Sequence, residues 1–144
     1  MKKYHIVLCS VFLFGFMGVL PLNAAGEKAV LEISVQSGKK GFYKPCSGTL
    51  EPCTVTIFKF GSEILLVTNK STSIYAKNIM ATLPAGWTDI SQDASACTML
   101  APGSTCTLTF TSSDDVLHSA ELVPVKGTNT VTAYVYIQVV DDFR

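Results

Sequence analysis

The chain has 144 residues, of which 48% are hydrophobic, and its 11 basic residues balance its 11 acidic ones. It contains no run of basic residues, which argues against nucleic acid and against an anionic membrane surface as partners. The length suits a single domain and excludes a large multidomain assembly within this sequence.

The N-terminus has the three-part pattern of a secretory signal peptide. Two lysines precede an apolar run over residues 6–20, Pro21 breaks this run, and the small residues Ala24-Ala25 follow. The run is shorter than the ~20 residues that span a membrane. We therefore expect residues 1–25 to be a cleaved signal peptide and residues 26–144 to be one exported domain, periplasmic or secreted, without stable membrane insertion.

Seven segments of the exported part show the alternation of apolar and polar residues that is typical of β-strands. No segment has apolar residues at helical spacing. The predicted strands are residues 29–36, 54–60, 63–68, 74–83, 105–111, 120–126 and 128–140.

The connections between these strands carry recognisable turn residues. Gly61-Ser62 predicts a hairpin between the second and third strands, and Pro84-Ala85-Gly86 predicts a turn after the fourth. Residues 38–48 suggest a long loop, and residues 89–96 a polar one. Pro124 cannot donate to a ladder, so it predicts an edge strand or a bulge.

The last predicted strand has the most regular pattern. One face carries Val131, Ala133, Val135, Ile137 and Val139, which we assign to the core. The opposite face then carries Tyr134 and Tyr136. In the same way, Val55 and Ile57 facing the core would leave Phe58 and Phe60 facing outward. Seven strands in about 119 residues predict an all-β, immunoglobulin-like sandwich.

Four cysteines remain after removal of the signal peptide, and an even number in an oxidising compartment indicates disulfides. Three pairings are possible. We favour Cys46–Cys53 and Cys97–Cys106, because each pair brackets a short segment rich in turn residues. A zinc site is the alternative, but its cysteines are usually closer in sequence than these. We expect no metal and no cofactor.

Catalytic residue types are sparse. His118 is the one histidine beyond the signal peptide, and it lies in a polar turn near Asp114-Asp115. A hydrolase would need His118 to meet an acid and a nucleophile such as Ser112 or Ser119 in a cleft, and no nucleophile-elbow motif is present. We expect a solvated turn histidine and no enzymatic activity.

Five aromatic residues are the candidate binding residues. Exposed aromatics on outer sheet faces are typical of interaction sites. Trp87 could stack on a ligand or cap one end of the core, and the long loop over residues 38–48 could cover the other rings. The candidates are Phe58, Phe60, Trp87, Tyr134 and Tyr136.

Several short motifs resemble the immunoglobulin-like repeats of exported bacterial surface proteins, in the neighbourhood of bacterial cell-adhesion-related domains. They are residues 65–71 (Leu-Leu-Val-Thr-Asn-Lys-Ser), 76–79 (Ala-Lys-Asn-Ile), 83–87 (Leu-Pro-Ala-Gly-Trp) and 100–103 (Leu-Ala-Pro-Gly), with Cys97 and the strand from Cys106 to Phe110. The resemblance implies a non-catalytic module for adhesion, spacing or display. The Cys46–Cys53 segment lies outside the matching part, and the chain has one copy.

We thus expect a protein-interaction or cell-surface-association domain whose partner is another protein or a surface component. The sequence does not indicate an oligomeric state. A small inhibitor or accessory protein that acts through the Cys46–Cys53 loop is the alternative from a different class. A hydrolase is the third hypothesis. Asn69-Lys70-Ser71 matches the pattern of a glycosylation acceptor, but we interpret it as a plain turn.

Overall fold

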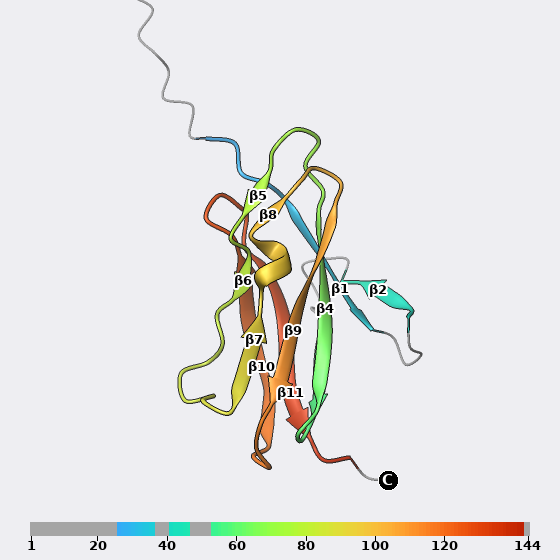
Figure 1. Cartoon of the computed structure of the whole chain (residues 1–144), viewed down its shortest axis with the longest axis vertical. Helices are drawn as coiled ribbons and strands as arrows, with labels where there is room; N and C mark the ends of the chain where they lie inside the picture. Colours follow the sequence, from blue (N-terminus) through green and yellow to red (C-terminus); the bar gives the residue numbers. More distant parts are fainter. Residues whose placement is uncertain (1–25, 37–40, 47–52, 143–144) are drawn as a thin grey trace, which may run out of the picture.

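The computed structural model describes residues 26–36, 41–46 and 53–142, which fold as an all-β structure with one short 3₁₀ helix (Figure 1). The predicted signal peptide, residues 37–40, and residues 47–52 inside the Cys46–Cys53 segment lie outside the described residues, so that only residues 41–46 of the predicted loop over residues 38–48 are described.

Two larger sheets form the body of the molecule (Figure 1). The first, here called the β4 sheet, has five strands in the order β2 (Tyr43–Pro45), β1 (Leu31–Gln36), β4 (Ser62–Asn69), β9 (Thr105–Ser112) and β7 (Ile90–Asp93). The second, the β11 sheet, has four in the order β3 (Thr54–Phe58), β11 (Ala133–Val140), β10 (His118–Lys126) and β6 (Met80–Ala81).

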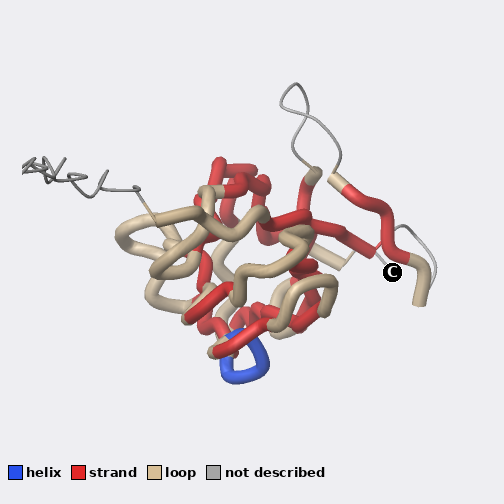
Figure 2. Tube along the Cα trace, turned by 90° about the horizontal axis from the view of Figure 1, so that it is seen from above, coloured by secondary structure: helices blue, strands red, loops and turns tan. Residues whose placement is uncertain are grey.

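A third, two-stranded sheet pairs β5 (Ala76–Lys77) with β8 (Met99–Leu100) near one end. The 3₁₀ helix η1 (Ser95–Cys97) lies between β7 and β8 in the sequence and at the periphery of the strands in the view along the long axis (Figure 2). All pairings of the larger sheets are antiparallel except that of β3 with β11, which is parallel.

The buried side chains of both larger sheets form one hydrophobic core. The inner residues of β4 and β9 meet those of β3, β10 and β11, in the period of two that a half-buried strand requires. The largest fully buried side chains include Phe110, Ile57, Leu65, Leu108 and Ile137. Each such side chain stabilises the fold by about 1.5–3 kcal/mol through its removal from water.

The alternation in the sequence predicted this core correctly along most strands. Leu31, Ile33 and Val35 of β1 are buried, as are Val55 and Ile57 of β3. The same holds for Cys106, Leu108 and Phe110 of β9 and for Val135, Ile137 and Val139 of β11.

The predicted hairpin at Gly61-Ser62 is wrong. β3 and β4 are consecutive in sequence but lie in different sheets. The Gly61 amide donates to the Phe58 carbonyl at 2.8 Å, and Phe60 adopts a left-handed conformation with φ of 55°. A Cβ at Gly61 would approach that carbonyl oxygen to 2.9 Å. This tight turn carries the chain from one sheet to the other.

The predicted strand over residues 74–83 is interrupted. Asn78 has a positive φ of 49°, which ends β5, and the chain then enters β6 in the β11 sheet. The alternation was real, because Ile79 and Ala81 are buried while Met80 is exposed. The alternation over residues 74–83 therefore did not reveal that the chain passes from one sheet to another at Asn78.

Two further predictions need correction. The segment over residues 89–96 was predicted to be a loop, but it contains β7, an edge strand whose polar residues hid its pattern, and the start of η1. Val131 was assigned to the core but is exposed, because β11 begins only at Ala133. The Val131 amide instead donates to the Ala29 carbonyl at 2.8 Å, beside the parallel bridge between Ala29 and Thr130.

The two predicted Pro-Gly turns are formed. In the first turn, the Trp87 amide donates to the Pro84 carbonyl, and Gly86 has a φ of 96°. In the second, the Ser104 amide donates to the Ala101 carbonyl, and Gly103 has a φ of 72°. A positive φ at the third position is the requirement of a type II turn, which favours glycine there.

Candidate interaction surface

The outer face of the β11 sheet carries a set of large apolar side chains, which we call the tyrosine face. Cross-strand pairing sets Leu122 opposite Tyr136, Pro124 opposite Tyr134, and Phe58 opposite Val140. Directly opposite residues of adjacent strands contact one another. These six residues define the tyrosine face.

Much of the tyrosine face is accessible. Tyr134 is 52% exposed, Leu122 48% and Phe58 44%, whereas Tyr136 is half-buried between its neighbours. Between the two ends of this face, the Gln138 amide donates to the Thr56 hydroxyl at 3.0 Å. The surface therefore combines exposed rings with a fixed polar contact, as protein-binding surfaces commonly do.

The outer face of the β4 sheet has a different chemistry. Every outward residue of β9 is a threonine, and hydroxyl contacts tie β9 to β4 from Ser62 to Thr111 and from Thr68 to Thr105, both at 2.8 Å. These side chains satisfy one another. Of the two outer faces, the tyrosine face is the one with exposed aromatic side chains.

Phe60 lies beside this surface rather than on a strand. It follows the end of β3, in the turn to β4, and is the most exposed large hydrophobic residue among those described, at 69%. The predicted outward positions of Phe58, Phe60 and Tyr134 thus correspond to exposed side chains.

Trp87 differs from these aromatics in that it is only 8% exposed. Its indole stacks on the His118 imidazole, with ring centroids 4.3 Å apart and planes at 29°. It therefore offers little surface for stacking on a ligand.

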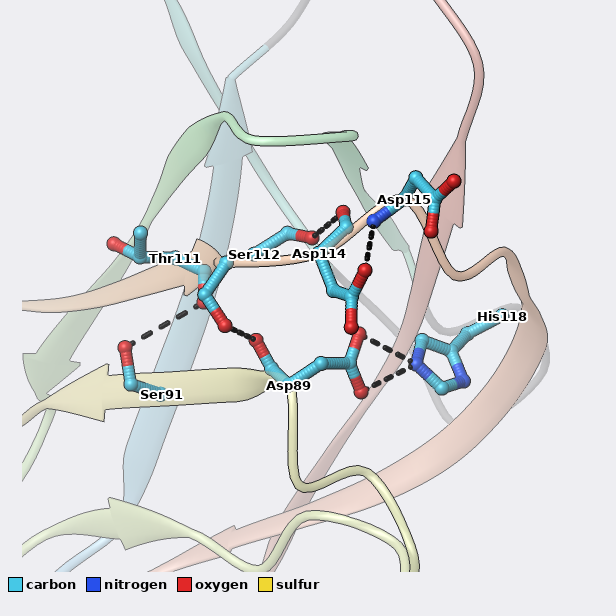
Figure 3. Close-up of polar contacts among 8 residues, drawn as sticks. Asp89, Ser91, Thr111, Ser112, Asp114, Asp115 and His118 are labelled. Carbon is cyan, nitrogen blue, oxygen red and sulfur yellow. Dashed lines mark hydrogen bonds and ion pairs between the residues drawn. The ribbon is translucent and has the colours of Figure 1, made fainter.

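The prediction of a solvated His118 is wrong. Its Nε2 contacts both carboxylate oxygens of Asp89, at 2.9 and 3.0 Å, and the two side chains are only 12% and 10% exposed (Figure 3). Trp87 and Asp89 both follow the Pro84–Gly86 turn, so that this turn brings both partners to His118 at the start of β10. The contact joins the segment before β7 to the β11 sheet.

The hydroxyls of Ser112 and Ser113 bond to backbone carbonyls near His118. The Ser112 hydroxyl donates to the Asp114 carbonyl at 3.2 Å (Figure 3), and the Ser113 hydroxyl to the Asp89 carbonyl at 3.0 Å. Both hydroxyls are thus used in holding the turn. The Asp115 amide donates to the Asp114 carboxylate in the same turn (Figure 3).

Asn69 of the Asn-Lys-Ser motif is fully buried. Its amide nitrogen donates to the carbonyls of Ile74 and Leu100, at 2.7 and 3.1 Å, and its carbonyl oxygen accepts from the Ser71 amide at 3.1 Å. A side chain held in this way has no free nitrogen for a glycan. The motif is a structural element that joins three loop segments.

Both predicted disulfides are formed, Cys46–Cys53 and Cys97–Cys106. Cys97 and Cys106 are buried in the core, whereas Cys46 and Cys53 are partly buried and pack against it. Two disulfides are consistent with an oxidising, exported environment. The loop proposed as an inhibitory segment, residues 47–52, lies outside the described residues.

Charged groups are dispersed. Among residues 26–36, 41–46 and 53–142, no group of three or more histidine, cysteine or acidic residues is placed to hold a metal ion. The Ser95 backbone amide donates to the Asp93 carboxylate at 2.9 Å and, with the Ser95 hydroxyl, holds the pKa of that carboxyl below its usual value. No helix in the described part of the chain is long and apolar enough to cross a membrane.

Sequence reasoning missed half of the tyrosine face. Leu122, Pro124 and Val140 were not candidates, because their place beside the aromatics depends on the register of β10 and β3 against β11. The strands predicted over residues 120–126 and 128–140 include these three residues, but the sequence does not show which side chains they lie beside. Asp89 was missed for the same reason, since it lies 29 residues from His118.

Comparison with known proteins does not assign the chain to a family. No model of a known protein family matches the chain, and no curated protein matches it.

Proposed function

We propose that this protein is an exported, non-catalytic, immunoglobulin-like domain that binds another protein through the tyrosine face. The exposed apolar group of Leu122, Pro124, Tyr134 and Tyr136 is the observation that carries this proposal, and Phe58 lies beyond Gln138 on the same face. Monomeric surfaces seldom expose contiguous apolar patches without an interaction that uses them.

The strand order supports the immunoglobulin-like assignment. The N-terminal part of the chain contributes first to one sheet, through β1, and then to the other, through β3, which runs parallel to the last strand. Two sheets facing one another over one core, with about 100 residues, fit the same architecture. A periplasmic or secreted location accords with the signal-peptide pattern and with the disulfides.

A non-catalytic role accords with the use of the polar side chains. His118 and Ser113 contact Asp89, and the Ser112 hydroxyl holds the turn at Asp114. The fold therefore serves as a rigid support for a surface, and aromatic side chains on such a support act as binding anchors at low cost in conformational entropy.

The test is a pair of substitutions on the tyrosine face. The processed protein is used to capture partners from the cell surface and periplasm of its native host, and the affinity for each captured protein is then measured. Leu122→Ser with Tyr134→Ser should weaken binding at least ~10-fold, since two anchors each contribute more than about 1 kcal/mol. The melting temperature should change little, because both side chains are about half exposed.

The matched control replaces Thr107 and Thr109 by alanine on the outer face of the β4 sheet. It should bind as the parent does. Equal binding by the Leu122→Ser/Tyr134→Ser variant and the parent would refute the proposed surface.

A further inference from the structure

One edge of the β11 sheet presents free backbone groups. β3 is the last strand of this sheet, and the Tyr136 amide donates to the Cys53 carbonyl while the Lys59 amide donates to the Val140 carbonyl. Backbone groups alternate sides along a strand. Cys53 and Lys59 are both odd-numbered, so the even-numbered residues Thr54, Thr56 and Phe58 direct their amides and carbonyls away from β11.

That side of β3 has no strand partner among the described residues. The strand also contains no charged residue, so it lacks the charges by which edges commonly resist pairing. Its outward backbone groups can therefore accept an extended strand.

The other three edges of the two larger sheets are protected against strand pairing. β2 is three residues long and carries Lys44 and Pro45, and β7 ends in Asp93. β6 is two residues long, and the Gln92 side chain pairs with the amide and carbonyl of Ala81 at 3.0 and 2.6 Å. These are known ways of blocking edge pairing, which makes the bare edge of β3 an exception among the edges of the two larger sheets.

The edge is complementary to itself. In an antiparallel, two-fold arrangement, Thr56 would lie opposite Thr56 of a second copy, and Phe58 opposite Thr54 of that copy. Thr56 would then exchange both backbone hydrogen bonds with Thr56 of the second copy, and the Phe58 amide would donate to the Thr54 carbonyl of that copy. The Phe58 carbonyl stays bonded to the Gly61 amide. Because the strand is uncharged, this register brings no like charges together.

The side chains fit the same register. Thr54 lies opposite Tyr136 within one copy. Phe58 of one copy would therefore lie on a small threonine of the other, with Tyr136 of that copy on the far side. Large and small side chains would thus alternate across the junction. Aromatic and β-branched residues on adjacent strands pair favourably.

We infer that two copies of this chain associate through their β3 edges, joining the two β11 sheets into one continuous sheet. The inference does not depend on partner binding by the tyrosine face. In the dimer the two tyrosine faces would lie on the same side of the joined sheet.

The test is the mass in solution of the protein processed from the full chain, measured by sedimentation over a concentration series. Wild type should form a dimer. Thr56→Pro removes an amide that faces away from β11, so it should yield a monomer with the β3–β11 ladder intact. Thr56→Val is the matched control, because it also loses the contact with Gln138 but keeps the amide, and it should remain a dimer.

A wild-type protein that stays monomeric up to high concentration would overturn the inference. So would a dimer that Thr56→Pro and Thr56→Val affect equally, because another surface would then be responsible. Amide hydrogen exchange of wild type gives a readout without any substitution. The amides of Thr56 and Phe58 should lose protection on dilution, whereas those of Val55 and Ile57 should not, and equal behaviour of the two pairs would contradict edge pairing.

Discussion

Asn69 shows how one buried polar residue can organise several loops. Its side chain satisfies two buried carbonyls, and its backbone amide and carbonyl pair with Ser104 and Gly103 of the second Pro-Gly turn. The sequence placed Asn69 in a turn, but Asn69 is the last residue of β4 and pairs with Leu31 of β1. The sequence could not reveal the contact with Leu100, which lies 31 residues away, because local patterns carry no information on distant carbonyls.

Asn69→Ala should destabilise the fold by about 3 kcal/mol, because it leaves two buried carbonyls without a donor. The measurement is the free energy of unfolding in denaturant. Thr72→Ala, an exposed neighbour, should change it by less than about 0.5 kcal/mol. A similarly small effect of Asn69→Ala would show that water replaces the lost donor.

The elements that the sequence predicted well are the long strands with a regular period of two. β1, β3, β4, β9, β10 and β11 all overlap predicted segments, because one face of each is buried in the core. β8 has two residues, which is too short for a period to be detected, and the alternation over residues 74–83 did not reveal that β5 and β6 lie in different sheets. The assignment of β3 and β4 to different sheets was also hidden, since a short Gly-containing turn commonly joins a hairpin.

Gln92 links the two larger sheets at the level of elements. It belongs to β7 in the β4 sheet, yet its amide pairs with Ala81 of β6 in the β11 sheet, as a backbone partner would. Gln92→Ala should lower the free energy of unfolding by about 1–2 kcal/mol and accelerate exchange of the Ala81 amide. Ser91→Ala, on the exposed side of the same strand, serves as the control. Unchanged exchange at Ala81 would contradict this role.

The two disulfides differ in accessibility, and this difference predicts the order in which they are reduced. Cys46–Cys53 lies at the partly exposed start of β3, whereas Cys97–Cys106 joins η1 to β9 within the core. A mild thiol reductant should open Cys46–Cys53 in the folded protein and leave Cys97–Cys106 intact until unfolding. Alkylation followed by peptide mass mapping checks this order, and simultaneous loss of both bridges would contradict it.

Removal of the buried Cys97–Cys106 disulfide should destabilise the fold more than removal of Cys46–Cys53. A short closed loop contributes about 2.5 kcal/mol on the loop-entropy account. Replacing both cysteines by alanine also removes two buried sulfur atoms from the packing. The pairing itself was predictable from sequence, because each cysteine pair brackets turn residues, whereas the difference in burial required the fold.

At the scale of the whole molecule, the two outer faces divide the surface into chemically different halves. The outer face of the β4 sheet carries the threonines of β9 beside the partly buried Ile64 and Leu66, while Tyr134, Leu122 and Phe58 give the β11 sheet exposed aromatic and aliphatic side chains. The alternation of apolar and polar residues predicted which residues of β3 and β11 face outward. The joining of their aromatics into one surface was not, because it depends on the parallel pairing of β3 with β11.

Site-specific photo-crosslinking in the native host tests most directly the claim that the tyrosine face binds another protein. A photoreactive phenylalanine analogue replaces Tyr134 in one strain and Thr109, on the opposite outer face, in another. We predict adducts with a different protein from position 134 and none from position 109. Adducts from position 109 alone, or none from position 134, would contradict the proposed function.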